Sequence, residues 1–138
     1  MPALDIFHEA LRKALVKDGW TITNNPLFLR VDDEPFYIDF GAAKLIIAEK
    51  VDRKIAVELK SFIGSSYTSD FHLAVGQFVN YRVVLRTIQP ERILYLAVPQ
   101  DTYAEYLGRR FPQTVIADQK LKLIVFDVSK AEIVLWIE

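Results

Sequence analysis

Apolar residues recur at helical spacing in three parts of the chain. The pattern predicts a first helix over residues 3–18, a long helix over residues 69–87 and a short helix over residues 101–110. Gly19 ends the first helix, and Pro90 follows the end of the second. The apolar stripes consist of Leu4, Phe7, Leu11, Ala14 and Leu15 in the first helix, and of Phe71, Val75, Phe78, Val79 and Leu85 in the second.

Strands are predicted where apolar and polar residues alternate, or where a short apolar run stands between turns. The predicted strands cover residues 20–23, 27–31, 36–40, 45–49, 54–62, 93–98, 121–126 and 132–137. Turn compositions separate them at residues 24–26, 32–34, 51–53 and 64–66. The run over 93–98 is continuously apolar, which indicates a strand buried on both faces. This order of elements predicts a single α/β or α+β domain over residues 1–138, with a mixed central sheet flanked by helices.

Alternation assigns faces within two of these strands. In residues 36–40, we expect Phe36, Ile38 and Phe40 on one face, and Tyr37 and Asp39 on the other. In residues 54–62, the apolar face consists of Ile55, Val57 and Leu59, while the opposite face consists of Ala56, Glu58 and Lys60.

Composition narrows the class of protein. The 138 residues include no cysteine, which excludes a disulfide framework, a thiolate zinc site and a cysteine nucleophile, and fits a cytoplasmic location. The start of the sequence does not resemble a signal peptide, and no apolar run is long enough to span a membrane. The net charge of −1 weighs mildly against nucleic-acid binding, although local basic patches matter more than the sum.

Two of the predicted strands carry acids in apolar surroundings, Asp39 in residues 36–40 and Glu58 in residues 54–62. Strand periodicity places Glu58 and Lys60 on the same face, and Asp39 shares it if the strands are adjacent. Two carboxylates, with the backbone carbonyl of Leu59, would suit Mg²⁺ or Mn²⁺, which can activate water at a phosphate. Lys60 would then orient that water or stabilise the phosphate charge. The alternative is a surface ion pair, the usual explanation of an isolated Glu-x-Lys.

Two helices offer supporting residues. Gln77 and Tyr81 are four residues apart and share a helix face, so they can contact a metal-bound water and the substrate backbone. His8 lies at the edge of the first apolar stripe and is a candidate metal ligand, whereas Glu9 points nearly opposite. The alternatives are a polar rim, a core tyrosine and a partly buried histidine. His72 has no evident partner and is expected at the surface.

Basic residues for DNA contacts are sparse. Arg82 and Arg86 follow Gln77 and Tyr81 on the long helix and are candidate substrate-binding residues. Arg109 and Arg110 form a second pair. Each pair can equally be a solvated face.

The ordered set His8, Asp39, Glu58-x-Lys60 and Gln77-xxx-Tyr81 resembles the PD-(D/E)XK nuclease superfamily, especially its RecB-like branch. Ile38 stands where that superfamily has proline. The resemblance implies a restriction-endonuclease-like fold. It also implies a catalytic set of Asp39, Glu58, Lys60 and Gln77, metal ligands in Asp39, Glu58, the Leu59 carbonyl and His8, and substrate contacts from Tyr81. Glu9 is the substitute for a helical acid found in other branches.

Longer segments resemble the XisH family, cyanobacterial factors that control excision of the fdxN DNA element. They are Lys-Asp-Gly-Trp-Thr-Ile-Thr (17–23), Tyr-Ile-Asp-Phe-Gly-Ala (37–42), Ala-Val-Glu-Leu-Lys-Ser-Phe (56–62), Ala-Val-Gly-Gln-Phe (74–78) and Leu-Tyr-Leu-Ala-Val-Pro (94–99). This resemblance implies work on or near DNA beside a recombinase, with a small XisI-like partner protein, and a homodimer is expected.

Two functional hypotheses follow. The first is a metal-dependent nuclease that hydrolyses DNA phosphodiesters during excision. The second is a catalytically silent regulator that uses a nuclease fold to bind a XisI-like partner or DNA.

Overall fold

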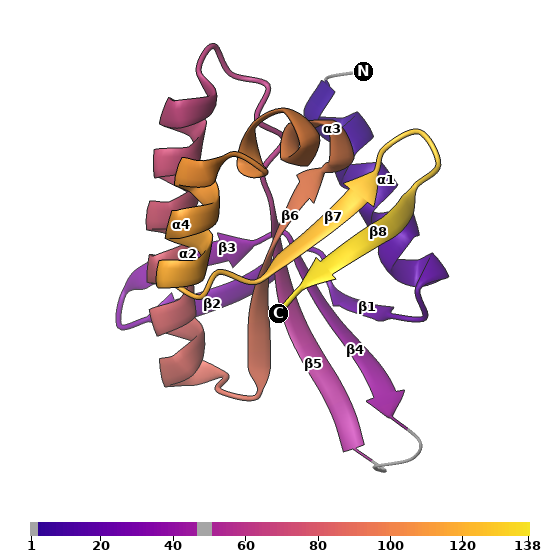
Figure 1. The fold of residues 1–138 in the computed structure, drawn as a ribbon. Coiled ribbons are helices and arrows are strands. Elements are labelled where there is room, and N and C mark those ends of the chain that lie inside the picture. The colour runs from indigo at the N-terminus through magenta and orange to yellow at the C-terminus, as the bar shows by residue number, and fades with distance from the viewer. Residues whose placement is uncertain (1–2, 47–50) are drawn as a thin grey trace.

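A six-stranded mixed sheet forms the centre of the computed structural model, which describes residues 3–46 and 51–138 (Figure 1). The strand order is β1-β4-β5-β6-β7-β8. Strands β5, β6 and β7 run parallel, and the other neighbours are antiparallel. The strands are β1 (Thr21–Asn24), β4 (Phe40–Ile46), β5 (Val51–Leu59), β6 (Arg92–Pro99), β7 (Leu123–Asp127) and β8 (Glu132–Ile137). The mixed α+β architecture expected from the sequence is confirmed at this level.

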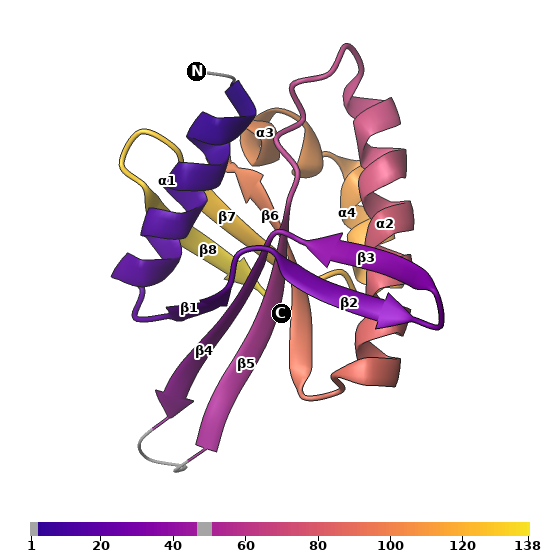
Figure 2. The same ribbon diagram turned by 180° about the vertical axis from the view of Figure 1, so that it is seen from behind.

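Helices cover both faces of the sheet, and a two-stranded ribbon adds to one of them (Figures 1 and 2). The ribbon consists of β2 (Leu27–Val31) and β3 (Glu34–Ile38). The helices are α1 (Ala3–Lys17), α2 (Tyr67–Ile88), α3 (Gln100–Thr102) and α4 (Arg110–Asp118), and η1 (Tyr103–Leu107) is a π-helical turn. None of the helices in residues 3–46 and 51–138 is long and apolar enough to cross a membrane.

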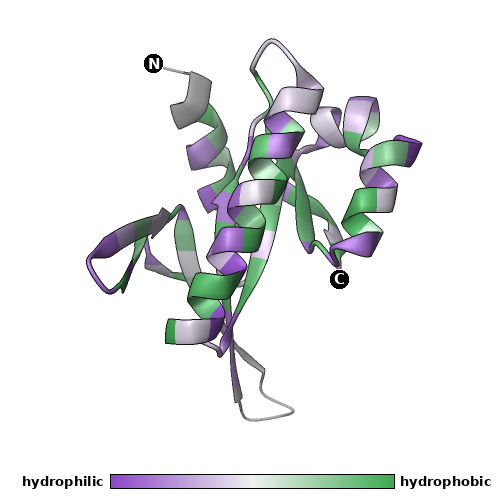
Figure 3. Ribbon diagram, turned by 90° about the vertical axis from the view of Figure 1, so that its left-hand side faces the viewer, coloured by the Kyte–Doolittle hydropathy of each residue, from purple (hydrophilic) through white to green (hydrophobic). Residues whose placement is uncertain are grey.

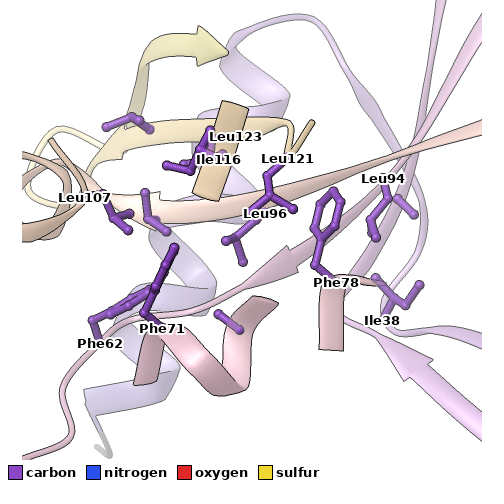
Figure 4. Close-up of a cluster of buried hydrophobic side chains, with 14 of the residues drawn as sticks. Ile38, Phe62, Phe71, Phe78, Leu94, Leu96, Leu107, Ile116, Leu121 and Leu123 are labelled. Atoms are coloured by element: carbon purple, nitrogen blue, oxygen red, sulfur yellow. The ribbon is translucent and has the colours of Figure 1, made fainter. Parts of the chain in front are cut away.

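The core has two parts, one on each face of the sheet. On one face, α2, α4 and the β2–β3 ribbon pack over β5, β6 and β7 through residues such as Phe71, Phe78 and Leu96 (Figure 4). On the other face, Leu11 and Leu15 of α1 pack with Phe40 and Phe126. Strand β6 contributes to both parts, so its predicted burial on two faces is confirmed.

The surface of α2 explains its place in the fold. Figure 3 views the molecule from the side that this helix covers, and its outward face mixes polar with apolar residues, among them Leu73 and Val83, which are 58% and 50% exposed. The hydroxyl of Ser66 accepts a hydrogen bond from the Ser69 amide at 3.2 Å and caps the helix start. The predicted helices over 3–18 and 69–87 are therefore confirmed within one or two residues.

Several predictions about element boundaries are wrong. The predicted strand over 36–40 is interrupted at Asp39, which forms a bend between β3 and β4. As a result Ile38 belongs to the α2 side of the core and Phe40 to the α1 side, although alternation had placed them together. Residues 51–53 continue β5 instead of forming a turn, because they pair with residues 44–46 of β4.

The third error concerns residues 100–118. The predicted single helix over 101–110 consists of α3 and η1, and a further helix, α4, follows it. Pro112 is tolerated in the first turn of α4, because an N–H at this position would have no partner within the helix.

The strand predicted over 45–49 begins earlier than expected. Residues 45 and 46 are the end of β4, and residues 47–49 lie outside the described residues.

Candidate functional site

An open pocket lies at the carboxyl end of β5, between α1 and the beginning of α2. Its volume is about 530 Å³. We call it the acidic pocket. Its lining consists of His8, Asp39, Glu58, Leu59, Lys60, Ser61, Phe62, Ile63, Gly64, Asp70 and Leu73. Four of the residues singled out from the sequence, together with Leu59, therefore line one cavity.

The two acids are interlocked through the backbone. The Leu59 amide donates to Oδ2 of Asp39 at 2.8 Å, and the Asp39 amide donates to Oε1 of Glu58 at 3.3 Å. The register of β4 and β5 causes this arrangement, because Phe40 pairs with Val57 and so brings the preceding Asp39 beside Glu58. The bend at Asp39 frees its side chain to reach the neighbouring strand. The predicted convergence of the two acids on adjacent strands is therefore present.

Lys60 lies on the same side as Glu58, just beyond the end of β5. Its Nζ is 3.7 Å from Oε2 of Glu58, and its side chain is 22% exposed. The Lys60 amide donates to the carbonyl of Ala97 on β6 at 3.0 Å, which holds this residue at the edge of the sheet. The backbone of Lys60 is thus held at the edge of the sheet, while its side chain lines the cavity.

Burial and charge perturb the acid pair. The pKa of Glu58 is raised to about 8, first by burial in the pocket and then by the nearby charge of Asp39. The charge of Lys60 acts in the opposite direction and offsets only part of this shift. The pKa of the Tyr81 hydroxyl is also raised, first by burial and then by the charges of Glu58 and Asp39. The charges of both acids therefore act on the Tyr81 hydroxyl, and Tyr81 lies one turn after Gln77 on α2.

The donor set suits a hard divalent cation. Asp39 and Glu58 offer carboxylate oxygens, which Mg²⁺ and Mn²⁺ prefer, and a cation between them would relieve the repulsion that raises the Glu58 pKa. Within residues 3–46 and 51–138, no three His, Cys, Asp or Glu side chains are grouped to hold a metal ion. Such an ion would therefore need water, substrate or backbone oxygens to complete its coordination, which is usual for Mg²⁺.

The helical candidates differ in their surroundings. His8 lines the acidic pocket, its Nε2 is 3.0 Å from Oδ1 of Asn25, and its ring lies 4.4 Å from that of Phe40. Asn25 therefore engages one of the two ring nitrogens of His8, Nε2. Glu9 is exposed and holds Arg12 in an ion pair at 2.6 Å, so it is directed away from the site.

Gln77 holds a buried polar atom without a partner. Its Oε1 is inaccessible to solvent and accepts no hydrogen bond from the described residues. Such an atom costs free energy unless it has a role or a ligand to satisfy it. Tyr81 packs edge-on against Phe36, with ring centroids 6.4 Å apart. Neither residue lines the acidic pocket.

Arg82 and Arg86 are not part of the acidic pocket. They line a second pocket farther along α2, with Arg92, Lys120 and Lys122. Nη1 of Arg82 donates to the carbonyl of Gln119 at 2.7 Å. The two arginines therefore line a different pocket from Asp39 and Glu58, and their role in substrate binding stays a prediction.

Sequence reasoning missed the loop over 61–64 and Asp70. Oδ2 of Asp70 accepts from the Gly64 amide at 3.1 Å, and a Cβ on Gly64 would lie 2.7 Å from Oδ1 of Asp70. The backbone of Phe62 is left-handed, with φ of 58°, while its side chain is buried. The glycine within Phe-Ile-Gly-Ser-Ser (62–66) was the available sign of this close approach.

Comparison with known proteins gives one family and two similar solved structures. The sequence matches the XisH protein family over residues 1–134. A crystal structure of an XisH family protein from Nostoc punctiforme PCC 73102 is 45% identical, with a TM-score of 0.88 over 97% of this chain and 100% of that one.

A second crystal structure, of a fdxN element excision controlling factor protein from Anabaena variabilis, is 42% identical, with a TM-score of 0.87 over 97% of this chain and 99% of the other. No curated protein matches the sequence at a significant level. The family match covers nearly all of the sequence, including every residue of the acidic pocket. The chain therefore belongs to the XisH family.

Proposed function

We propose that this protein is a metal-dependent deoxyribonuclease of the PD-(D/E)XK type that takes part in the controlled excision of a DNA element. The observation that carries the proposal is the interlocked pair of Asp39 and Glu58, with Lys60 at 3.7 Å, in one open pocket. The excision role rests on the family and on the relative from Anabaena variabilis, which is described as a fdxN element excision controlling factor.

In this proposal, Asp39, Glu58 and the Leu59 carbonyl would hold Mg²⁺ or Mn²⁺, with His8 as a further ligand through one ring nitrogen. When bound, the cation would lower the pKa of a coordinated water and neutralise charge on the phosphate. The Leu59 amide fixes the Asp39 carboxylate. Lys60 orients the attacking water or stabilises the charge that develops on the phosphate. Tyr81 lies within electrostatic reach of both acids, and Gln77 and Tyr81 would contact the metal-bound water or the substrate only if a bound DNA strand extends beyond the acidic pocket.

The test compares the wild type with Lys60→Ala and with a control, Lys13→Ala, an exposed lysine on α1. Labelled single-stranded, duplex and branched DNA is incubated with Mg²⁺ or Mn²⁺, with and without a XisI-like partner protein. We expect cleavage that leaves 5′-phosphates, a loss of about 100-fold in Lys60→Ala and no change in Lys13→Ala. Equal cleavage by the wild type and Lys60→Ala would refute the proposal.

A catalytically silent regulator is the second candidate. It is favoured by the acid pair itself, because the described residues provide only two grouped carboxylates and His8 is engaged by Asn25. In this case the fold binds DNA or a XisI-like partner, and no tested DNA is cut by any variant. The substitution Asp39→Asn decides between the two, since a silent regulator keeps its control of excision after this change while a nuclease loses it.

A further inference from the structure

A second pocket of about 300 Å³ lies between the carboxyl-terminal half of α2, the start of β6 and the turn that leads into β7. We call it the basic pocket. Its charged lining residues are all cations, namely Arg82, Arg86, Arg92, Lys120 and Lys122. Three separate segments supply them, so folding is what brings these charges together.

Among the residues that the structure describes, no carboxylate lines the basic pocket. Two acids lie close enough to act on its cations. Burial lowers the pKa of Arg92 and the charge of Glu91 offsets part of this, while the hydrogen bond from Tyr95, then Arg53 and last Lys122, lower the pKa of Glu138. Within residues 3–46 and 51–138, neither Glu91 nor Glu138 forms an ion pair with Arg86 or Lys120. The protein therefore leaves a local excess of positive charge in a concave site, although its net charge is −1.

Two of the arginines are held in fixed positions. Arg82 donates to the Gln119 carbonyl, and its guanidinium lies 5.3 Å from the ring centroid of Phe78. Arg92 donates to Oε1 of Gln89 at 2.7 Å and to the Ile55 carbonyl at 2.9 Å. Burial lowers the pKa of Arg92, so the cation is incompletely compensated. These two residues supply a preorganised field, and the exposed Arg86 and Lys120 remain free to contact a ligand.

The rest of the lining is apolar. Pro90 and Ile93 form an exposed wall, with Ile93 38% exposed, and Phe78, Leu85 and Leu94 close the floor. A ligand with a flat apolar body and an anionic group matches both parts. Arginine and lysine recognise phosphate oxygens, and a guanidinium plane or an apolar wall accepts the face of a base.

We propose that the basic pocket binds a nucleotide through its phosphate, either free or as a unit of a DNA strand. Arg86 and Lys120 contact the phosphate, Arg82 and Arg92 supply the surrounding charge, and the base lies against Ile93. The pocket is separate from the acids, because Leu73 and Arg86 lie roughly 20 Å apart along α2. The strand form rests on the proposed action on DNA, whereas the free form does not.

The experiment measures binding in EDTA, so that failure of the proposed nuclease does not affect it. The probes are 2′-deoxyadenosine 5′-monophosphate, 2′-deoxyadenosine and a short single-stranded oligonucleotide with a 5′-phosphate, each followed by calorimetry at low salt. The variants are Arg86→Gln and Lys120→Gln, and the control is Arg110→Gln, which removes an exposed arginine on α4. Unfolding midpoints equal to that of the wild type establish that the variants are folded.

We expect the monophosphate or the oligonucleotide to bind and the nucleoside to fail. Each pocket variant should weaken binding about tenfold or more, and the control should not. Tighter binding of the oligonucleotide assigns the site to a DNA strand, and equal or tighter binding of the monophosphate assigns it to a free nucleotide. Amide NMR shifts at Ile93 and Leu94 on titration provide a second readout in the wild type. The proposal is overturned if neither phosphate probe binds, or if the pocket variants bind as the wild type does.

Discussion

Glu58 is the charged residue that is buried among the described residues. It is 9% exposed, lies beside Asp39, and is only partly balanced by Lys60 at 3.7 Å. The native state therefore holds a proton on Glu58 up to a pKa of about 8, whereas the unfolded chain releases it near 4.5. Between these values the folded protein binds more protons than the unfolded one. Stability is thus full below about pH 4.5 and is lost as the pH rises through about 8.

The substitution Glu58→Gln should remove this pH dependence. Urea unfolding of the wild type should show a fall in the free energy of unfolding, on the order of 2 to 4 kcal/mol, between about pH 5 and pH 8. The variant should show a flatter profile and greater stability than the wild type at pH 8. Glu9→Gln is the matched control, because Glu9 is exposed on α1 and its loss leaves the acidic pocket unchanged. A wild-type profile that rises over this range would contradict the assignment.

At the scale of elements, the bend at Asp39 has the largest consequence. It lets one segment serve two sheets, with Ile38 in the core beneath α2 and Phe40 in the core beneath α1. Both side chains are 0% exposed, so they fix the chain on either side of the acid. The position of the Asp39 carboxylate therefore depends on packing in two separate parts of the core.

Truncation of Ile38 tests this dependence. We expect Ile38→Ala to lower the free energy of unfolding by about 2 to 5 kcal/mol, because a fully buried side chain leaves a cavity. Val134→Ala on β8 is the control, since Val134 is 44% exposed and its loss should cost about 0.5 kcal/mol or less. Chemical denaturation measures both. An Ile38→Ala variant as stable as the control would show that the bend is held by other contacts.

The sequence predicted regular elements well because their periodicity is local. The shared face of Glu58 and Lys60 was predictable for the same reason, since the two alternate on one strand, but the approach of Asp39 depended on which strands become neighbours. The bend at Asp39 was not predictable, because Phe36, Ile38 and Phe40 alternate as they would in a continuous strand. The pairing of Ile38 with Leu27 on one side and of Phe40 with Val57 on the other shows that the chain changes sheet there.

Two further features required the tertiary structure. Helix α4 escaped prediction because Pro112 stands near its beginning and its apolar stripe is short, with Pro112 and Ile116 as its buried residues. The basic pocket escaped because its cations come from α2, β6 and the turn before β7, and no run of charge marks them. Arg82 and Arg86 were visible as a pair on one helix, but their partners Lys120 and Lys122 were not.

At the scale of the whole molecule, the two pockets lie at different positions along the neighbouring strands β5 and β6. In the register of β5 and β6, Glu58 pairs with Leu96 and Lys54 pairs with Arg92. Glu58 and Arg92 are therefore offset by four residues, roughly 13 Å along the strands. The charges that shift the pKa of Arg92 do not include Glu58. The acidic and basic pockets should accordingly be independent in energy, although they share the sheet.

A double-mutant cycle tests this independence. Arg92→Met removes donors to Asn24 and to the Ile55 carbonyl, so it should destabilise the fold by about 1 to 3 kcal/mol. Glu58→Gln should stabilise it at pH 8, because it removes a buried charge. The two sites share no hydrogen-bond partner, and the distance between them is larger than the distance over which pairs of residues usually couple. The two changes in the free energy of unfolding should therefore add within about 0.5 kcal/mol in urea unfolding at pH 8. A coupling above about 1 kcal/mol would mean that the shared strands transmit strain between the pockets, and ligands of the two would then affect each other's affinity.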